Sequence, residues 1–336
     1  SGGYSNSSAR VPSHGRKGYR DHPGVGPSGL ARQAVSRQDA AMQQSDSERA
    51  EMAKYPFIID VFGWFPPERL TVRFDASPRP TTPELESLIA TEWDRQTESA
   101  RQSDRMLFNG ALFRYLDHAI CGKGDDSRFE LTVGPTCYRD FVGTNLFNNH
   151  LLGRFGWNRF ANPIGTTATV ITSDRMICLG RRSERVAYHA GHVHTFGGGL
   201  EERDRAKDGT IDAVGSVARE LAEELALKRP ELPGLGCVGL IRDREIHQPE
   251  LLFEVELDLT ASELRSRWQT AESQDEHVDL VTLPDDPDAV VPFIKSCGPI
   301  APVAIGALSL HGRARWGESW FREAAAALNV ERGPRR

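Results

Sequence analysis

Three glutamates, Glu220, Glu223 and Glu224, lie at the spacing of one helix face within the segment RELAEEL at 219–225. A helix turns by about 100° per residue, so side chains at i, i+3 and i+4 are neighbours. Carboxylates crowded in this way repel one another unless a hard cation lies between them, and Mg²⁺ or Mn²⁺ takes such oxygen ligands together with substrate phosphates. The residues therefore predict a metal site for phosphate chemistry. The alternative is a solvated charged face, on which Arg219 pairs with Glu223 at i+4.

Two neighbouring features would position these carboxylates. A helix expected over 212–227 carries a separate apolar stripe that can seat it on a core, made of Val214, Ala218, Leu221 and Leu225. Upstream, a short strand expected over 192–196 leads into three glycines at 197–199. Glycines before a helix allow close backbone approach and predict a phosphate-binding turn. We expect the Gly197 carbonyl to join the three glutamates as a metal ligand.

These segments together resemble the Nudix box, Gly-x5-Glu-x7-Arg-Glu-U-x-Glu-Glu-x-Gly-U with U aliphatic. This box marks hydrolases that split nucleoside diphosphates linked to another moiety. Gly198 matches the first glycine, and the segment 219–227 matches the second half. Twenty residues separate Gly198 from Arg219 where the pattern has thirteen, so we expect an inserted polar loop at 203–209. Counted back from Arg219, the middle Glu is replaced by Ile211, next to Asp212, and Ala226 replaces the last glycine.

A second resemblance lies in the segment YRDFVGTN at 138–145. It is similar to the YRDFxGTN segment of an animal Nudix branch that hydrolyses UDP-glucose and UDP-galactose, a branch with a stretched box of its own. The likeness extends to LF at 107–108, FR at 113–114, NPIG at 162–165 and LGRRS at 179–183. The resemblance implies that uridine or the sugar is recognised by Tyr138, Arg139, Asp140 and Asn145. The alternative is a structural turn with an internal Arg–Asp pair.

Other polar residues are candidates for the same site. Arg181 and Arg182 follow a strand just before the box, and their guanidinium groups suit diphosphate oxygens, although a solvated hairpin tip is equally compatible with the pattern. Glu276 lies in an acidic loop before a strand and is our candidate general base, with an exposed loop as the alternative. Three histidines at 189, 192 and 194 have metal-like spacing. Zinc needs three or four tetrahedral ligands and no cysteine is close, so we expect two of these histidines to line the glycine turn.

The order of elements predicts an α/β fold. We expect a Nudix α/β/α sandwich with a mixed sheet, preceded by a small α+β unit. The expected division is a disordered tail at 1–52, the α+β unit at 53–150 and the Nudix domain at 151–330. Expected elements include paired strands at 57–62 and 70–74, a helix over 82–103 and a hairpin of 166–172 with 176–180. Further along, we expect a strand at 251–259, a helix capped at Thr260 or Ser262, a strand at 278–283 and a helix over 317–329.

Composition narrows the class of protein. The net charge of -6 gives no general attraction to nucleic acid, so local arginines and a metal must hold a phosphate ligand. No apolar run approaches the length of a transmembrane helix. Five widely spaced cysteines favour reduced thiols in a cytoplasmic protein. We expect a small-molecule nucleotide-sugar substrate, no nucleic-acid or membrane partner, and a monomer or homodimer.

The resemblance implies metal-dependent hydrolysis of UDP-glucose or UDP-galactose to UMP and a sugar 1-phosphate. Mg²⁺ or Mn²⁺ is the implied cofactor, and Arg219 would orient a box carboxylate. Two alternatives stay open. One is a Nudix hydrolase of another linked nucleotide, such as ADP-ribose or a dinucleotide. The other is a non-catalytic Nudix-like binding module, suggested by the irregular box.

Overall fold

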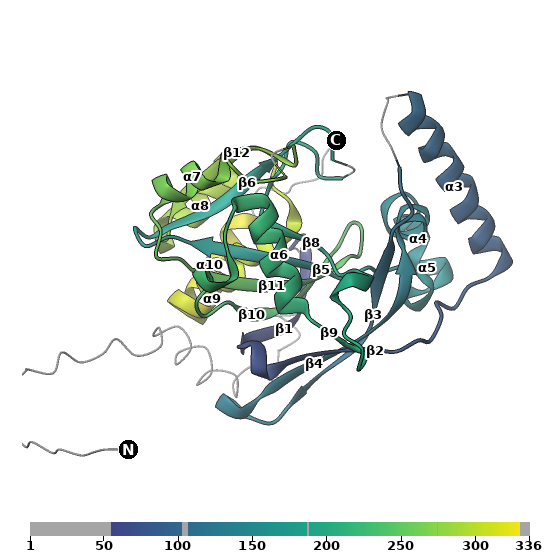
Figure 1. Cartoon of the computed structure of the whole chain (residues 1–336), viewed down its shortest axis with the longest axis horizontal. Helices are drawn as coiled ribbons and strands as arrows, with labels where there is room; N and C mark the ends of the chain where they lie inside the picture. Colours follow the sequence, from purple (N-terminus) through teal and green to yellow (C-terminus); the bar gives the residue numbers. More distant parts are fainter. Residues whose placement is uncertain (1–54, 103–106, 187, 274, 330–336) are drawn as a thin grey trace, which may run out of the picture.

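The structure, a computed structural model, describes residues 55–102, 107–186, 188–273 and 275–329 (Figure 1). The tail predicted at 1–52 lies outside these ranges. Within them, no helix combines the length and apolar character needed to cross a membrane.

The larger sheet, sheet A, has the strand order β1-β10-β11-β5-β6-β12, with β8 paired to β5 and β7 paired to β6. Parallel pairing joins β11 to β5, and the other pairs are antiparallel, so the sheet is mixed. Its strands are β1 (Phe57–Phe65), β5 (Gly165–Ile171), β6 (Met176–Arg182), β7 (Val193–His194), β8 (Phe196–Gly199), β10 (Gly236–Asp243), β11 (Pro249–Glu256) and β12 (His277–Pro284).

Helices cover both faces of sheet A (Figure 1). One face packs against α6 (Ala213–Leu225) and α7 (Ala261–Trp268), with Leu221 and Leu225 in the same core as Phe253 of β11. The other face packs against α8 (Pro287–Ser296), α9 (Pro302–Trp316) and α10 (Glu318–Asn329). Both faces are covered, which is why β5 is buried along its whole length. The expected α/β/α sandwich with a mixed sheet is confirmed.

A smaller sheet, sheet B, has the order β3-β4-β2-β9 and lies beside sheet A (Figure 1). Its strands are β2 (Leu70–Phe74), β3 (Ala111–Cys121), β4 (Arg128–Cys137) and β9 (Thr210–Ile211). The helical segments near it are α3 (Pro83–Gln102), α4 (Tyr138–Phe141), η4 (Val142–Leu146) and α5 (Leu152–Phe155). Residues of sheet B, including Phe129 and Leu131, share a core with α6.

Most predicted elements are present, but one predicted pairing is wrong. The strands at 57–62 and 70–74 do not pair with each other: β1 pairs with β10, whereas β2 pairs with β4 and β9. Two short runs on either side of a Pro-Pro turn suggest a hairpin locally, and only the distant partner strands decide otherwise. Since β1 completes sheet A, the unit predicted at 53–150 contributes to both sheets, and the proposed division into domains stays a prediction.

Candidate active site

The box helix α6 begins as predicted, because Asp212 caps it by accepting a hydrogen bond from the Gly215 N–H at 2.7 Å. The glycines before it do not form the expected turn: 197–199 form part of strand β8, paired with β5. Glycine is needed there for space. A Cβ at Gly198 would lie 2.8 Å from the Glu220 carboxyl carbon, and one at Gly197 would collide with the Thr166 carbonyl. The glycine strand therefore lets α6 bring its carboxylates against the sheet.

Glu224 is the most deeply placed of the three box glutamates. It is 2% exposed, and its Oε2 accepts a hydrogen bond from the Gly197 N–H at 2.8 Å. Its Oε1 is buried and has no hydrogen-bond partner among the described residues. Burial raises the pKa of Glu224 well above its ordinary value of 4.5, and the charges of Glu276 and Glu220 raise it further. Such a carboxylate is suited to a cation.

Arg219 holds the next carboxylate in place. Its Nη1 lies 2.6 Å from Glu220 Oε1 and 3.7 Å from Glu223 Oε1, and its Nη2 lies 3.1 Å from Asp204 Oδ1. Burial nevertheless raises the pKa of Glu220, with Arg219 opposing the shift. Arg219 thus orients Glu220 and joins the helix to the loop before it.

Asp204 is a site residue that the sequence reasoning missed. Counted forward, it follows Gly198 after five residues, so it stands at the Gly-x5-Glu position of the box. The insertion therefore falls after it, in 205–211, and not at 203–209. Part of the insertion forms β9, which pairs with β2 and places Thr210 opposite Arg73. Counting from the first glycine instead of back from Arg219 would have found the acidic residue.

Glu276, the predicted general base, lies beside the box carboxylates. It immediately precedes β12, and its backbone carbonyl accepts a hydrogen bond from the Ser183 N–H at 2.8 Å. Burial raises the pKa of its carboxyl group, with Arg182 lowering it and the charges of Asp275 and Glu223 raising it. Glu276 also raises the pKa of both Glu220 and Glu224, so the four carboxylates form one electrostatic cluster.

The two neighbouring arginines have different environments. The Arg181 side chain is hydrogen-bonded to the backbone. Its guanidinium donates to the Gly191 carbonyl at 3.2 Å and to the Cys297 carbonyl at 2.9 Å. Arg182 instead lies among the acidic groups, where its charge lowers the pKa of Glu224 and Glu276. Its guanidinium carbon is 5.4 Å from the centre of the Tyr188 ring, and its Nε is buried without a hydrogen-bond partner among the described residues. Arg182 therefore places a positive charge among the acidic groups, as Arg219 does beside Glu220.

Three histidines beside this cluster, His189, His194 and His277, are held neutral. Burial lowers the pKa of His189 to about 4 and that of His277 to about 4, and lowers the pKa of His194 well below its ordinary value; Arg182 contributes to each shift. His192 and His194 each direct Nδ1 to a local backbone carbonyl, of Ala190 and Thr195 respectively. The rings of His189 and His192 are 5.4 Å apart, but the histidines and the described residues around them form no group arranged for zinc.

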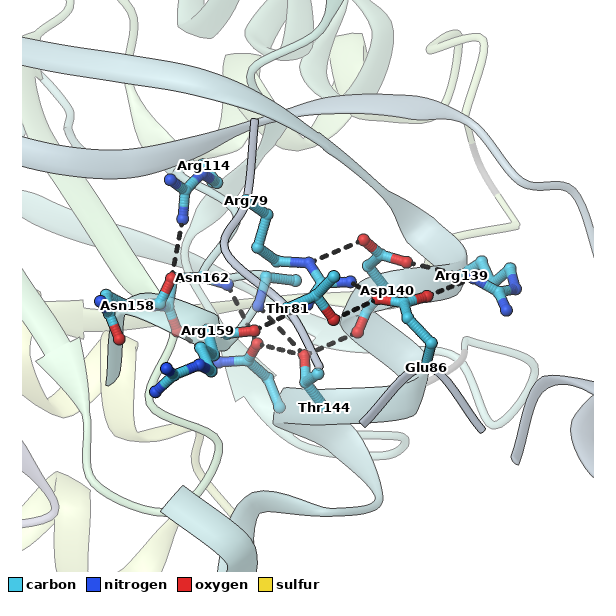
Figure 2. Close-up of polar contacts among 12 residues, drawn as sticks. Arg79, Thr81, Glu86, Arg114, Arg139, Asp140, Thr144, Asn158, Arg159 and Asn162 are labelled. Carbon is cyan, nitrogen blue, oxygen red and sulfur yellow. Dashed lines mark hydrogen bonds and ion pairs between the residues drawn. The ribbon is translucent and has the colours of Figure 1, made fainter. Parts of the chain in front are cut away.

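The segment 138–145 is bound into the structure by its own contacts (Figure 2). Asp140 Oδ2 accepts a hydrogen bond from Arg79 Nε at 2.9 Å, and Arg79, only 7% exposed, also reaches Glu86 at 2.6 Å and the Arg159 carbonyl at 2.8 Å. Arg139 pairs with Asp140 at 3.4 Å.

Asn145 is fully buried and donates to Asn162 Oδ1 at 3.0 Å and to the Ile246 carbonyl at 2.8 Å. These contacts favour the structural turn for Asp140 and Asn145, and their contact with substrate stays a prediction. The two aromatic residues of the segment, Tyr138 and Phe141, are connected to Arg182 by ring contacts. The Tyr138 ring is 6.3 Å from Phe141, which is 6.0 Å from Tyr188, the ring beside Arg182.

The acidic cluster fits a divalent cation in its chemistry. It offers carboxylate oxygens from α6 and Glu276, and one of them, Glu224 Oε1, is buried without a hydrogen-bond partner among the described residues. Burial and then the neighbouring negative charges raise the pKa values of Glu220, Glu224 and Glu276, and a cation would relieve that repulsion. As they stand, no three His, Cys, Asp or Glu side chains in the described ranges are arranged to hold a metal ion. Ligation by Glu220, Glu223, Glu224 and the Gly197 carbonyl is therefore part of the proposal below.

Some known proteins are similar in sequence to this chain. No family model matches the chain. Nudix hydrolase 9 of Arabidopsis thaliana is 26% identical over 276 residues, covering 69% of this chain and 84% of that protein. The uridine diphosphate glucose pyrophosphatase NUDT22 of Mus musculus is 27% identical over 196 residues, 51% of this chain and 62% of that protein. The corresponding Homo sapiens protein is 25% identical over 229 residues, 61% of this chain and 74% of that protein.

Solved structures include a MutT Nudix hydrolase from Burkholderia pseudomallei, with 19% identity, a TM-score of 0.31 and coverage of 44% of this chain and 96% of that chain. That TM-score is too low to add an argument. The sequence relatives confirm the resemblance read from the motifs, since this chain is similar in sequence to Nudix hydrolases. They support a hydrolase enzyme.

Proposed function

We propose that the protein hydrolyses the diphosphate of a UDP-sugar, UDP-glucose or UDP-galactose, to UMP and a sugar 1-phosphate. The observation that carries the proposal is the gathering of the α6 carboxylates, Glu276 and Arg182 where β6 ends and β12 begins. His277, next to Glu276, pairs with Arg182, and Glu276 and Arg182 both shift the pKa of Glu224. Hydrolysis of a diphosphate needs both kinds of group. Cations bind the phosphate oxygens, and carboxylates hold a metal ion and accept the proton of the attacking water. The names of the mouse and human relatives support uridine diphosphate glucose as the substrate.

Glu220, Glu223, Glu224 and the Gly197 carbonyl would hold Mg²⁺ or Mn²⁺. The bound metal would offset negative charge on the diphosphate and lower the pKa of a coordinated water. Arg219 keeps the Glu220 carboxylate in one orientation through their 2.6 Å contact. Glu223 keeps its freedom to reach a ligand, because its contact with Arg219 is longer, at 3.7 Å.

Glu276 would accept the proton released when a water oxygen bonds to phosphorus and the P–O bond to the leaving phosphate breaks. Its raised pKa makes it a better base near neutral pH than an exposed glutamate. Arg182 would bind diphosphate oxygens with its planar guanidinium. The rings of Tyr138, Phe141 and Tyr188 would place the nucleoside beside Arg182, with the partly exposed Arg139 at its edge.

A substrate panel tests the proposal. UDP-glucose, UDP-galactose, ADP-ribose, NADH and CoA are incubated with the protein and Mg²⁺ or Mn²⁺, and products are separated by chromatography. We expect UMP from the UDP-sugars at the highest kcat/KM. Preference for ADP-ribose or a dinucleotide would overturn the substrate, and no turnover of any compound would favour a binding module.

A matched pair of variants tests Glu276. We expect Glu276→Gln to lower kcat by about 10²–10⁴-fold, the usual contribution of a general base. The adjacent Asp275→Asn is the control, since Asp275 is exposed and should keep near wild-type kcat. Equal losses of kcat in both variants would show that the negative charge of the loop matters, and that residue 276 is not the general base.

The five cysteines are free thiols, which fits the cytoplasmic location that we also propose.

A further inference from the structure

His277 is a buried histidine to which the proposed reaction gives no role. It is the first residue of β12 and is 2% exposed. Its ring packs against Gly180 of β6, where a Cβ would collide with it, and its centre is 5.3 Å from the centre of the Phe196 ring. The glycine therefore provides the space that the imidazole occupies.

The ring nitrogens of His277 form no hydrogen bond with any described residue, although both are buried. Nδ1 lies 3.7 Å from Glu224 Oε1, which is itself buried without a hydrogen bond. Packing does not explain a histidine at this position. An apolar side chain could fill the space without the free energy cost of burying nitrogens that have no hydrogen-bond partner.

His311 shows what a histidine with a structural role looks like in the same protein. It is fully buried on α9, with Nδ1 2.8 Å from Glu254 Oε2 and Nε2 2.8 Å from Asp285 Oδ1. Both nitrogens of His311 therefore help to hold the fold together. The facing atoms of His277 and Glu224 are close but not bonded, so this pair does not have the same role.

A hydrogen bond from His277 would complete the support of the Glu224 carboxylate. The Gly197 N–H already donates to Oε2 at 2.8 Å, so Oε1 is the oxygen without a donor. The 3.7 Å separation from Nδ1 is roughly half an ångström longer than an N–H···O hydrogen bond, and a small rotation of either side chain would close it. An ionised carboxylate has about four lone-pair sites, so an oxygen that accepts one hydrogen bond can still bind a cation.

We propose that His277 is a positioning residue: its Nδ1–H donates to Glu224 Oε1 and, together with the Gly197 N–H, fixes the carboxylate for a divalent cation. This inference rests on the proposed function, in which Glu224 is a metal ligand. Nε2 lies on the side of Gly180, so Nδ1 is the nitrogen that can donate to the carboxylate. Residues that hydrogen-bond to a metal ligand orient it and raise the affinity for the metal.

The test measures the Mn²⁺ affinity of the full chain by calorimetry and its melting temperature without metal, so neither result depends on the substrate. We expect His277→Leu to weaken Mn²⁺ binding by about tenfold to a hundredfold. Its melting temperature should equal or exceed that of the wild type, because the change removes two buried nitrogens that form no hydrogen bond. In a Glu224→Gln background, His277→Leu should cause little further loss of Mn²⁺ affinity.

Two amide variants keep the test decisive if leucine packs poorly. His277→Asn places an amide N–H near the position of Nδ1, whereas His277→Gln places it near that of Nε2. We expect His277→Asn to retain most of the Mn²⁺ affinity and His277→Gln to lose it as His277→Leu does. Equal Mn²⁺ affinities in the two amide variants, or wild-type affinity in His277→Leu, would overturn the inference and leave the proposed function standing.

His311→Leu is the control for a buried histidine away from the site. It should lower the melting temperature, because the bonds to Glu254 and Asp285 are lost, and leave Mn²⁺ affinity unchanged. An equal loss of Mn²⁺ affinity in both leucine variants would show a general effect on the fold and would also overturn the inference. Failure to hydrolyse UDP-glucose, with Mn²⁺ binding and its dependence on His277 intact, would reject only the proposed substrate.

Discussion

Glu224→Gln separates the metal-binding role of the acidic cluster from its role in folding. The carbonyl oxygen of glutamine can still accept the Gly197 N–H, which now bonds Glu224 Oε2 at 2.8 Å. The amide replaces the buried Oε1, which has no partner among the described residues, and removes one charge repelled by Glu276 and Glu220. We therefore expect activity to fall by at least about a hundredfold while the metal-free protein folds normally.

The loss of metal binding in Glu224→Gln can be measured by thermal unfolding with and without Mn²⁺. With Mn²⁺ at about 100 times its Kd, binding to the wild type would add about 2.7 kcal/mol, which is about 5–10 °C for a domain of this size. Glu224→Gln should lose most of that shift. Wild-type turnover, or a full Mn²⁺ shift in the variant, would refute the proposed site.

The pH dependence of the metal-free proteins gives a second check. The native pKa of Glu224 lies well above its ordinary value of 4.5, so the native state keeps a proton that the unfolded chain releases. This contribution to stability is fully present below about pH 4.5 and is lost as pH rises through the raised native pKa. Glu224→Gln should therefore match the wild type at low pH and exceed it in melting temperature at pH 8. A constant difference across this range would contradict the assignment.

Two further predictions concern residues that support the site without belonging to the acidic cluster. Ala226 ends α6 in the left-handed region at φ 55, so Ala226→Gly should stabilise the protein by about 1 kcal/mol, seen as a higher urea midpoint with unchanged kcat; a lower midpoint would show that no strain is stored there. Asp140→Ala should destabilise by about 1–3 kcal/mol, because Arg79 loses a partner, and should depress turnover of all substrates alike. A selective loss with UDP-sugars at unchanged melting temperature would instead restore Asp140 as a recognition residue.

Local signals made part of this structure predictable. The acidic cap of α6 and the capping box of α7, in which Thr260 and Glu263 bond reciprocally, depend on residues three positions apart. The carboxylates at i, i+3 and i+4 depend only on helix geometry. Helices α8 and α9 were missed: α8 contains Pro292, and α9 is buried along most of its length, so it lacks an amphipathic pattern.

Side-chain direction at the site could not be predicted. Arg181 and Arg182 are adjacent in β6, so they point to opposite faces, but their spacing does not reveal which face carries the acidic groups. Pairing with β12 settles this, because it brings the segment before His277 beside Arg182.

The pairing of β1 with β10 has a consequence for how the chain must fold. Asp60 and Arg242, which bond across these two strands at 2.5 Å, are separated by 182 residues. Closing so long a loop is slow, and on a ribosome β1 cannot pair until most of the chain has emerged. A fragment beginning after β1 would expose the unpaired backbone N–H and C=O groups of β10. These groups could then pair with a strand of another copy and cause aggregation. Expression trials that trim the N-terminus should therefore stop before Phe57, since removing this strand would be expected to yield aggregates.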